Sequence, residues 1–106
     1  MTLPGSDVSL QLPAEITVSG QRYSVRVVDY IPGESMIGHT EHHMQVITIQ
    51  ASVSEDVARD TLLHETLHAI EAVGHIEIGE KIIDSLATIL LDTLRRNPAL
   101  VVALLS

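Results

Sequence analysis

The sequence of 106 residues contains no cysteine, phenylalanine or tryptophan, and its only aromatic side chains besides histidine belong to two tyrosines. Without cysteine, disulfide bonds and thiolate metal sites are excluded, so any bound metal must be held by histidine and carboxylate side chains. With so few aromatic residues, the interior must be built from isoleucine, leucine, valine and alanine. The lack of cysteine also suits a reducing compartment, and we expect a cytoplasmic protein.

Basic residues are scarce as well. Six lysines and arginines stand against fourteen aspartates and glutamates, which gives a formal net charge of −8. Such a chain repels phosphate backbones and offers no basic stripe for the release of counterions. Nucleic acid is therefore a poor candidate for a partner.

Long hydrophobic runs are also missing. The longest one, Ala99 to Leu105, is far too short to span a bilayer. No apolar segment led by lysine or arginine opens the chain, so we expect no signal peptide and no membrane partner. These features predict a soluble protein.

The length and composition fit a single domain over residues 1–106, with a modest core. Charged residues make up 19% and hydrophobic residues 45% of the chain, which argues against disorder. Residues Met1 to Pro13 mix proline, glycine and serine without periodicity, and we interpret them as a loosely attached leader.

Strand signals occupy the first half of the chain. Glu15 to Val18 and Gln21 to Val28 are rich in β-branched residues and flank Ser19-Gly20, a pattern that predicts a hairpin. Asp29 to His43 contains proline and glycine and is expected to be a long irregular connection. Met44 to Gln50 is expected to form a third strand.

The first helix is expected to begin after Ser52 or Ser54, either of which can cap it. Acidic residues follow in its first turn, where the helix N-terminus favours negative charge. The helix should extend to about Val73, and Gly74 should end it.

A second helix should begin near Gly79-Glu80 and end near Asn97-Pro98. The order of elements predicts an α+β domain in which a small, three-stranded, mainly antiparallel sheet packs on two helices. The apolar tail, residues 99–106, can complete the intramolecular core or form a homodimer contact, and we favour the first.

The functional hypothesis begins with His64-Glu65-Thr66-Leu67-His68, which has the pattern H-E-x-x-H. On a helix, two imidazoles at positions i and i+4 share one face and can bind zinc, and the adjacent carboxylate can act on the zinc-bound water. Leucine, isoleucine and valine side chains lie mainly on the far side of this helix. Core packing therefore does not explain the two histidines.

A hydrolytic zinc site takes three protein ligands and keeps a fourth position for water, so a third ligand is needed. The downstream candidates are Glu71, His75, Glu77, Glu80 and Asp84. If the second helix returns antiparallel to the first, a residue one turn or more into it comes level with the histidines, which favours Asp84. Glu80 lies on the same face as Asp84, so the choice is not forced.

The segment Thr61 to Ile70, followed by a glycine-containing turn, an acidic helix and Arg-Arg-Asn-Pro, resembles the small HExxH zincin-like proteins of bacteriophages and bacteria, a minimal gluzincin-type core. The resemblance covers Ile16 to Pro98. It implies a carboxylate ligand on the helix after the motif, at a position matching Asp84, where a gluzincin would carry glutamate. It also implies that the edge strand of the sheet, mapped onto Met44 to Gln50, can pair with an extended peptide. The expected location of such a protein is the cytoplasm of a bacterial or phage-infected cell.

The predicted function is thus that of a zinc metallopeptidase acting on a peptide or protein substrate. His64, His68 and Asp84 would hold Zn²⁺, and Glu65 would be the general base. An oxyanion-stabilising donor remains open among His39, His42, His43, Tyr23 and Tyr30.

Two alternatives remain. In the first, the protein is a non-catalytic phage or bacterial regulatory or binding protein, and a structural zinc site is closed by a fourth protein ligand such as His75 or Glu80. In the second, the motif is accidental and the α+β fold binds no metal.

Overall fold

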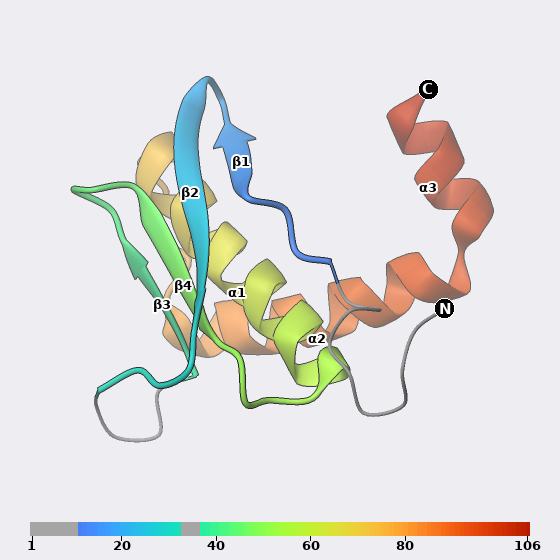
Figure 1. Cartoon of the computed structure of the whole chain (residues 1–106). Helices are drawn as coiled ribbons and strands as arrows, with labels where there is room; N and C mark the ends of the chain where they lie inside the picture. Colours follow the sequence, from blue (N-terminus) through green and yellow to red (C-terminus); the bar gives the residue numbers. More distant parts are fainter. Residues whose placement is uncertain (1–10, 33–36) are drawn as a thin grey trace.

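The computed structural model describes residues 11–32 and 37–106, and most of the expected leader therefore lies outside the described residues. Figure 1 shows a sheet with two crossing helices on one side of it and a third, C-terminal helix that stands apart. The elements are, in chain order, β1 (Glu15–Val18), β2 (Gln21–Val28), β3 (Gly38–Glu41), β4 (Val46–Gln50), α1 (Glu55–Gly74), α2 (Glu80–Arg96) and α3 (Pro98–Leu105).

The predicted hairpin is confirmed. Strands β1 and β2 pair antiparallel, with Glu15 opposite Ser24. The turn between them places Ser19 at φ 46° and Gly20 at φ 82°. Two consecutive positive φ values are typical of the tight turns that match the twist of a hairpin, and glycine adopts them without steric cost.

The α+β class is correct, but the expected three-stranded, mainly antiparallel sheet is not. The sheet has four strands in the order β1-β2-β4-β3. β4 pairs parallel with β2 and antiparallel with β3. The additional strand, β3, falls in the segment expected to be irregular, because its sequence Gly-His-Thr-Glu has no apolar alternation and its pairing with β4 defines it.

The expectation that Met44 to Gln50 forms the edge strand is wrong. β4 lies between β2 and β3, and β3 is the edge strand instead. The interior position of β4 agrees with its side chains, because Ile47 and Ile49 are 0% and 1% exposed.

Helix α1 lies between two apolar clusters. On its sheet side, Ala69 packs with Tyr23, Ile47 and Ile49. On its other side, Leu67 packs against Ile83 and Ala87 of α2. This double packing fixes the orientation of α1 and therefore the direction in which the remaining side chains of its H-E-x-x-H segment point.

The ends of α1 agree closely with the expected ones. The Ser54 side chain accepts a hydrogen bond from the amide of Val57 at 3.2 Å, so Ser54 rather than Ser52 is the cap. The helix extends to Gly74, and the left-handed residue that ends it is His75, with φ 54°.

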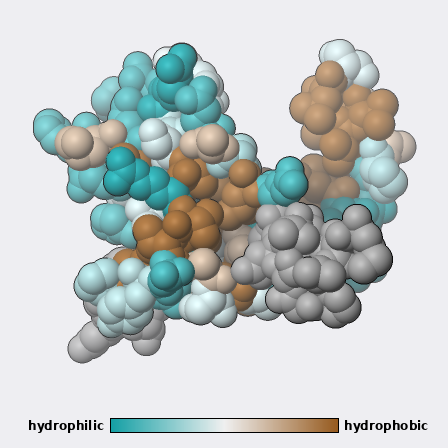
Figure 2. Space-filling model, in the orientation of Figure 1, coloured by the Kyte–Doolittle hydropathy of each residue, from teal (hydrophilic) through white to brown (hydrophobic). Residues whose placement is uncertain are grey.

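Helix α3 does not join the core. None of its residues is buried, and Leu105 is 80% exposed. Figure 2 shows α3 as a hydrophobic lobe that stands apart from the sheet. The favoured expectation that the tail completes the intramolecular core is therefore wrong.

Within the described ranges, no helix combines the length and the apolar character that crossing a membrane requires.

Candidate metal centre

The two histidines of the H-E-x-x-H segment lie side by side on α1. Their ring centroids are 5.0 Å apart, and the side chains of His64 and His68 are 14% and 21% exposed. Both rings direct Nε2 towards Glu80, the first residue of α2. The distances from Oε1 of Glu80 are 2.9 Å to Nε2 of His64 and 2.6 Å to Nε2 of His68.

These residues form a set of metal-ligand type. One ligand atom from each of His64, His68 and Glu80 lies within 4.8 Å of the others. Two imidazole nitrogens and a carboxylate oxygen are ligands that zinc accepts in proteins. Ligand atoms around a tetrahedral zinc ion lie roughly 3.3 Å apart. The Glu80 side chain would have to withdraw by a few tenths of an ångström, and at 70% exposure it is free to do so.

Both ring nitrogens of His68 face carboxylates. Nε2 faces Glu80, and Nδ1 lies 3.2 Å from Oε1 of Glu71. Burial alone would lower the pKa of His68, but the hydrogen bonds to Glu80 and Glu71 outweigh it and raise that pKa above its usual value. Without metal, the protonated ring can donate from both nitrogens. A metal ion on Nε2 would replace one proton and leave Nδ1–H donated to Glu71.

The two carboxylates beside His68 are shifted in the opposite direction. Partial burial alone would raise the pKa of Glu80, but hydrogen bonds from His68 and His64 outweigh it and hold that pKa below its usual value. The pKa of Glu71 is lowered chiefly by the backbone amides of Gly79 and Ile78, which donate to its carboxylate. Both groups therefore favour the ionised form, which Glu80 would need in order to bind a metal ion.

The structure brings Glu80, not Asp84, to the two Nε2 atoms. Asp84 lies on the opposite side of the first histidine, with Oδ1 3.6 Å from Nδ1 of His64. The reason is the position of α2 along α1. Because the amides of Ile78 and Gly79 donate to Glu71 on α1, α2 begins beside His68 and its first residue already reaches the two Nε2 atoms.

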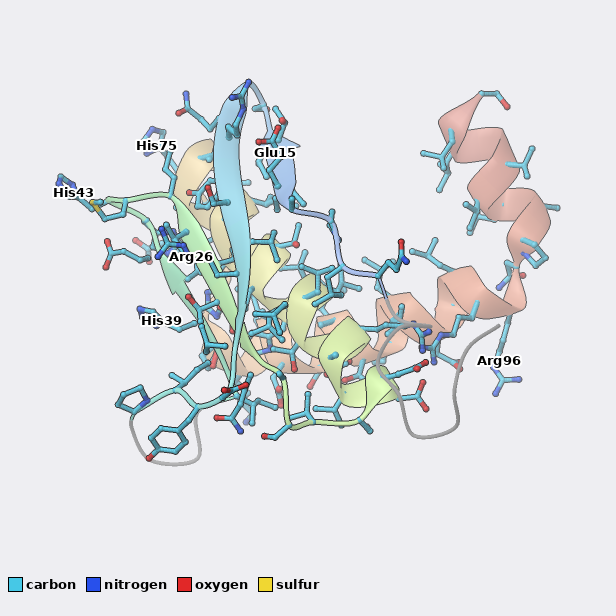
Figure 3. All side chains as sticks on the ribbon, viewed as in Figure 1. Glu15, Arg26, His39, His43, His75 and Arg96 are labelled. Atoms are coloured by element: carbon cyan, nitrogen blue, oxygen red, sulfur yellow. The ribbon has the colours of Figure 1, made fainter. Side chains whose placement is uncertain are left out.

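The other downstream candidates lie elsewhere. His75 ends α1 in a left-handed conformation and is exposed, as is Glu77. Figure 3 shows His75 at the end of α1. Neither residue belongs to the ligand set found among the described residues.

The Glu65 side chain points towards the edge strand β3. It is only 7% exposed. The hydroxyl of Thr40 on β3 donates to Oε1 of Glu65 at 2.6 Å and lies 3.3 Å from the Glu65 carbonyl oxygen. Gly38 makes this approach possible, because a Cβ there would overlap the Thr61 side chain and lie 3.1 Å from Oε2 of Glu65.

A cleft of about 330 Å³ joins these groups. It is lined by Gly38, His39, Thr40, His42, Glu65, His68 and Glu80. The lining thus combines residues of the edge strand β3 with two of the candidate ligands, His68 and Glu80, and with Glu65. A carboxylate, a possible metal site and a free strand edge meet in one concave surface.

The five residues considered as oxyanion donors differ in their position relative to the cleft. Tyr23 belongs to the apolar core, and Tyr30 is 69% exposed. His43 lies at the tip of the connection between β3 and β4, as Figure 3 shows. His39 and His42 line the cleft and remain the candidates.

Sequence reasoning missed Thr40 and Gly38 altogether. Both lie in the segment expected to be irregular, and only the pairing of β3 with β4 brings them to α1. The alternation of β3 could have separated its two faces, since Gly38 and Thr40 are partly buried whereas His39 and Glu41 are exposed.

No protein-family model matches this chain, and neither the curated proteins nor the solved structures include one that is significantly similar to it.

Proposed function

We propose that this protein is a zinc-dependent peptide hydrolase of the minimal zincin type. The observation that carries the proposal is the convergence of Nε2 of His64, Nε2 of His68 and Oε1 of Glu80 within 4.8 Å, beside a cleft that is lined by Glu65. His64, His68 and Glu80 are the ligands in this proposal, so Glu80 replaces the Asp84 expected from the sequence. A gluzincin likewise has glutamate, not aspartate, as its carboxylate ligand, although the resemblance matched that ligand to the position of Asp84.

A bound zinc ion supplies Lewis acidity and lowers the pKa of a water molecule towards neutrality. With zinc held by His64, His68 and Glu80, Glu65 would be the general base, whose carboxylate would accept a proton from the attacking water and donate it to the leaving amine of the peptide. Thr40 holds the carboxylate in place through its 2.6 Å hydrogen bond. A fixed base is an advantage because proton transfer depends on the geometry of its heavy atoms.

The substrate in this proposal is an extended peptide. β3 is the edge strand, and the side of β3 that faces away from β4 carries backbone groups that a peptide strand can pair with. The side chains of β3 that face α1 line the same cleft as Glu65. A peptide added to this edge would therefore lie along the cleft, and His39 and His42, which line that cleft, are the candidate donors to a developing oxyanion.

The competing proposal, a structural zinc site in a binding protein, requires a fourth protein ligand. In the part of the chain that the structure describes, the ligand set has three members. A set of three leaves a coordination position for water, which favours the catalytic proposal.

Replacing Glu65 with glutamine tests the proposed function. Glutamine keeps the shape of the side chain and an oxygen that can accept from Thr40, but it cannot take a proton. We expect Glu65→Gln to bind zinc as wild type does and to lose at least about 100-fold in peptide hydrolysis, the contribution typical of a general base. The readout is cleavage of an unstructured peptide library by the zinc-loaded protein.

The matched control is Glu77→Gln, which removes the same charge from an exposed position and should cleave as wild type does. Equal cleavage by Glu65→Gln and wild type would refute the assignment of the base. A zinc-loaded wild-type protein that cleaves nothing in the library would favour the structural zinc site.

A further inference from the structure

Glu71 occupies a position between two of the proposed ligands. One carboxylate oxygen, Oε1, lies 3.2 Å from Nδ1 of His68. The other, Oε2, accepts hydrogen bonds from the amides of Ile78 at 2.7 Å and Gly79 at 2.8 Å. The same side chain therefore contacts the ring of one ligand and the backbone that immediately precedes Glu80, another ligand.

The contact with His68 controls the orientation of the ring. A carboxylate at Nδ1 keeps the proton on that nitrogen, so Nε2 presents its lone pair when a metal ion is bound. Nε2 is the atom that faces Glu80 and His64 in the ligand set. The hydrogen bond also restricts rotation of the ring. The restrained ring therefore loses less conformational entropy when a metal ion binds than a freely rotating ring would.

The contact with the amides controls where α2 begins. Gly79 is the N-cap of α2 and has φ 95°. Because glycine has no side chain, α2 has no capping hydrogen bond from its own N-cap side chain. The first amides of a helix need acceptors, and so do the amides just before it when the turn is tight. Glu71 supplies that acceptor from α1 for Ile78 and Gly79, and so anchors the turn to the helix that carries both histidines.

We propose that Glu71 is a positioning residue of the metal centre, which sets His68 and Glu80 in register so that the site is preorganised for a divalent cation such as zinc. This inference rests on the proposed metal site but not on peptide hydrolysis. It concerns affinity for the metal and not the chemical step.

Zinc affinity of the folded protein tests the inference. Wild type, Glu71→Gln and Glu71→Ala are titrated with zinc in competition with a chromophoric chelator, well below their melting temperatures, and circular dichroism verifies that each is folded. Loss of such an outer carboxylate typically weakens metal binding by about 10- to 100-fold. We expect a loss in this range for Glu71→Gln and a loss at least as large for Glu71→Ala.

The control variant is Glu77→Gln, which removes one charge from the same turn but involves no hydrogen bond in the described structure. It should bind zinc as wild type does, which separates positioning from a general effect of charge. If Glu71 served only to brace the turn, Glu71→Gln would lower the melting temperature and leave the zinc Kd of the folded protein unchanged. That result would overturn the inference.

The outcomes distinguish this inference from the proposed function. Zinc binding that is weakened in Glu71→Gln upholds the inference even if no peptide is cleaved. Tight and equal binding by wild type and both Glu71 variants overturns it and leaves the metal site standing. A folded wild-type protein that binds no zinc overturns the metal site and the inference together.

Discussion

Thr40 and Glu65 form the most consequential contact between single residues in the site, because the contact joins the sheet edge to the helix that carries the histidines. The hydroxyl of Thr40 donates to a carboxylate that is only 7% exposed. A buried carboxylate that loses its donor retains its desolvation penalty, which typically costs about 1–3 kcal/mol.

Replacing Thr40 with valine keeps the shape of the side chain and removes the donor. We therefore expect Thr40→Val to lower the free energy of unfolding by about 1–3 kcal/mol, measured by denaturant titration of the metal-free protein. Thr40→Ser keeps the hydroxyl and should recover most of that loss. Equal destabilisation by valine and serine would assign the effect to packing of the methyl group instead.

His68 gives the site a dependence on pH. Its pKa is raised above 6.5, so in the metal-free protein its interactions stabilise the fold fully below pH 6.5, and the contribution is lost as the pH rises through the raised value. The pKa values of Glu71 and Glu80 are lowered from 4.5, so their contribution is present above pH 4.5 and is lost as the pH falls through the lowered values. The cluster without metal is therefore most stable between these limits.

An NMR titration of the His68 ring in the presence of a chelator checks this directly, and we expect a midpoint above 6.5. Zinc reverses the trend, because it requires Nε2 without its proton, so zinc binding should strengthen as the pH rises through that midpoint. A midpoint at or below 6.5 would show that the effect of burial, which lowers the pKa of His68, outweighs the effect of the two carboxylates, which raise it.

At the scale of elements, the features that could be predicted correctly are those that short, local sequence signals specify. Ser54 caps α1 and Ser19-Gly20 turns the hairpin, and both signals are contained in a few neighbouring residues. β3 has no such signal. Its four residues become a strand only because β4, itself paired with β2, offers a free edge.

The same limit explains why the sequence favoured a different third candidate ligand. The sequence placed a carboxylate of the second helix near the histidines but favoured Asp84 over Glu80. The choice depends on the offset of α2 along the axis of α1. That offset is determined by the hydrogen bonds that the amides of Ile78 and Gly79 donate to Glu71. Two helices related by a short turn can adopt several such offsets, and periodicity does not select among them.

The close packing of β3 on α1 leads to a prediction for Gly38. A Cβ at this position would overlap Cγ2 of Thr61. Forcing extra volume into such a contact typically costs about 1–3 kcal/mol, so we expect Gly38→Ala to lower the free energy of unfolding by that amount in a denaturant titration.

Gly74→Ala is the matched control for Gly38. A Cβ at Gly74 would meet only the end of the flexible Ile76 side chain, and alanine is the better helix former. The control should be neutral or stabilising. If Gly38→Ala were equally harmless, β3 would have to be held less closely against α1 than the structure indicates.

At the scale of the whole molecule, the unusual feature is α3, which stands apart from the sheet and from α1 (Figure 1). Its sequence Pro-Ala-Leu-Val-Val-Ala-Leu-Leu is apolar on every side, and none of its residues is buried. A helix that is hydrophobic all round is normally covered. We therefore predict that α3 mediates self-association.

Sedimentation velocity over a range of concentrations tests this prediction. We expect wild type to associate, and the double variant Val102→Asp, Leu104→Asp to remain monomeric. Since both side chains are more than half exposed, at 67% and 66%, the variant should keep the melting temperature of the unassociated protein. A wild-type protein that stays monomeric at the highest concentrations would rule out association through α3.

The central claim is that the fold assembles a metal site from His64, His68 and Glu80. Its most direct test is the zinc content, by mass spectrometry, of protein purified without added metal, for wild type, His68→Ala, Glu80→Ala and the neighbouring control Asp84→Ala. We predict near-stoichiometric zinc in wild type and in Asp84→Ala, and its loss in the other two variants. Zinc retained by Glu80→Ala and lost from Asp84→Ala, or a folded wild-type protein without metal, would contradict the account.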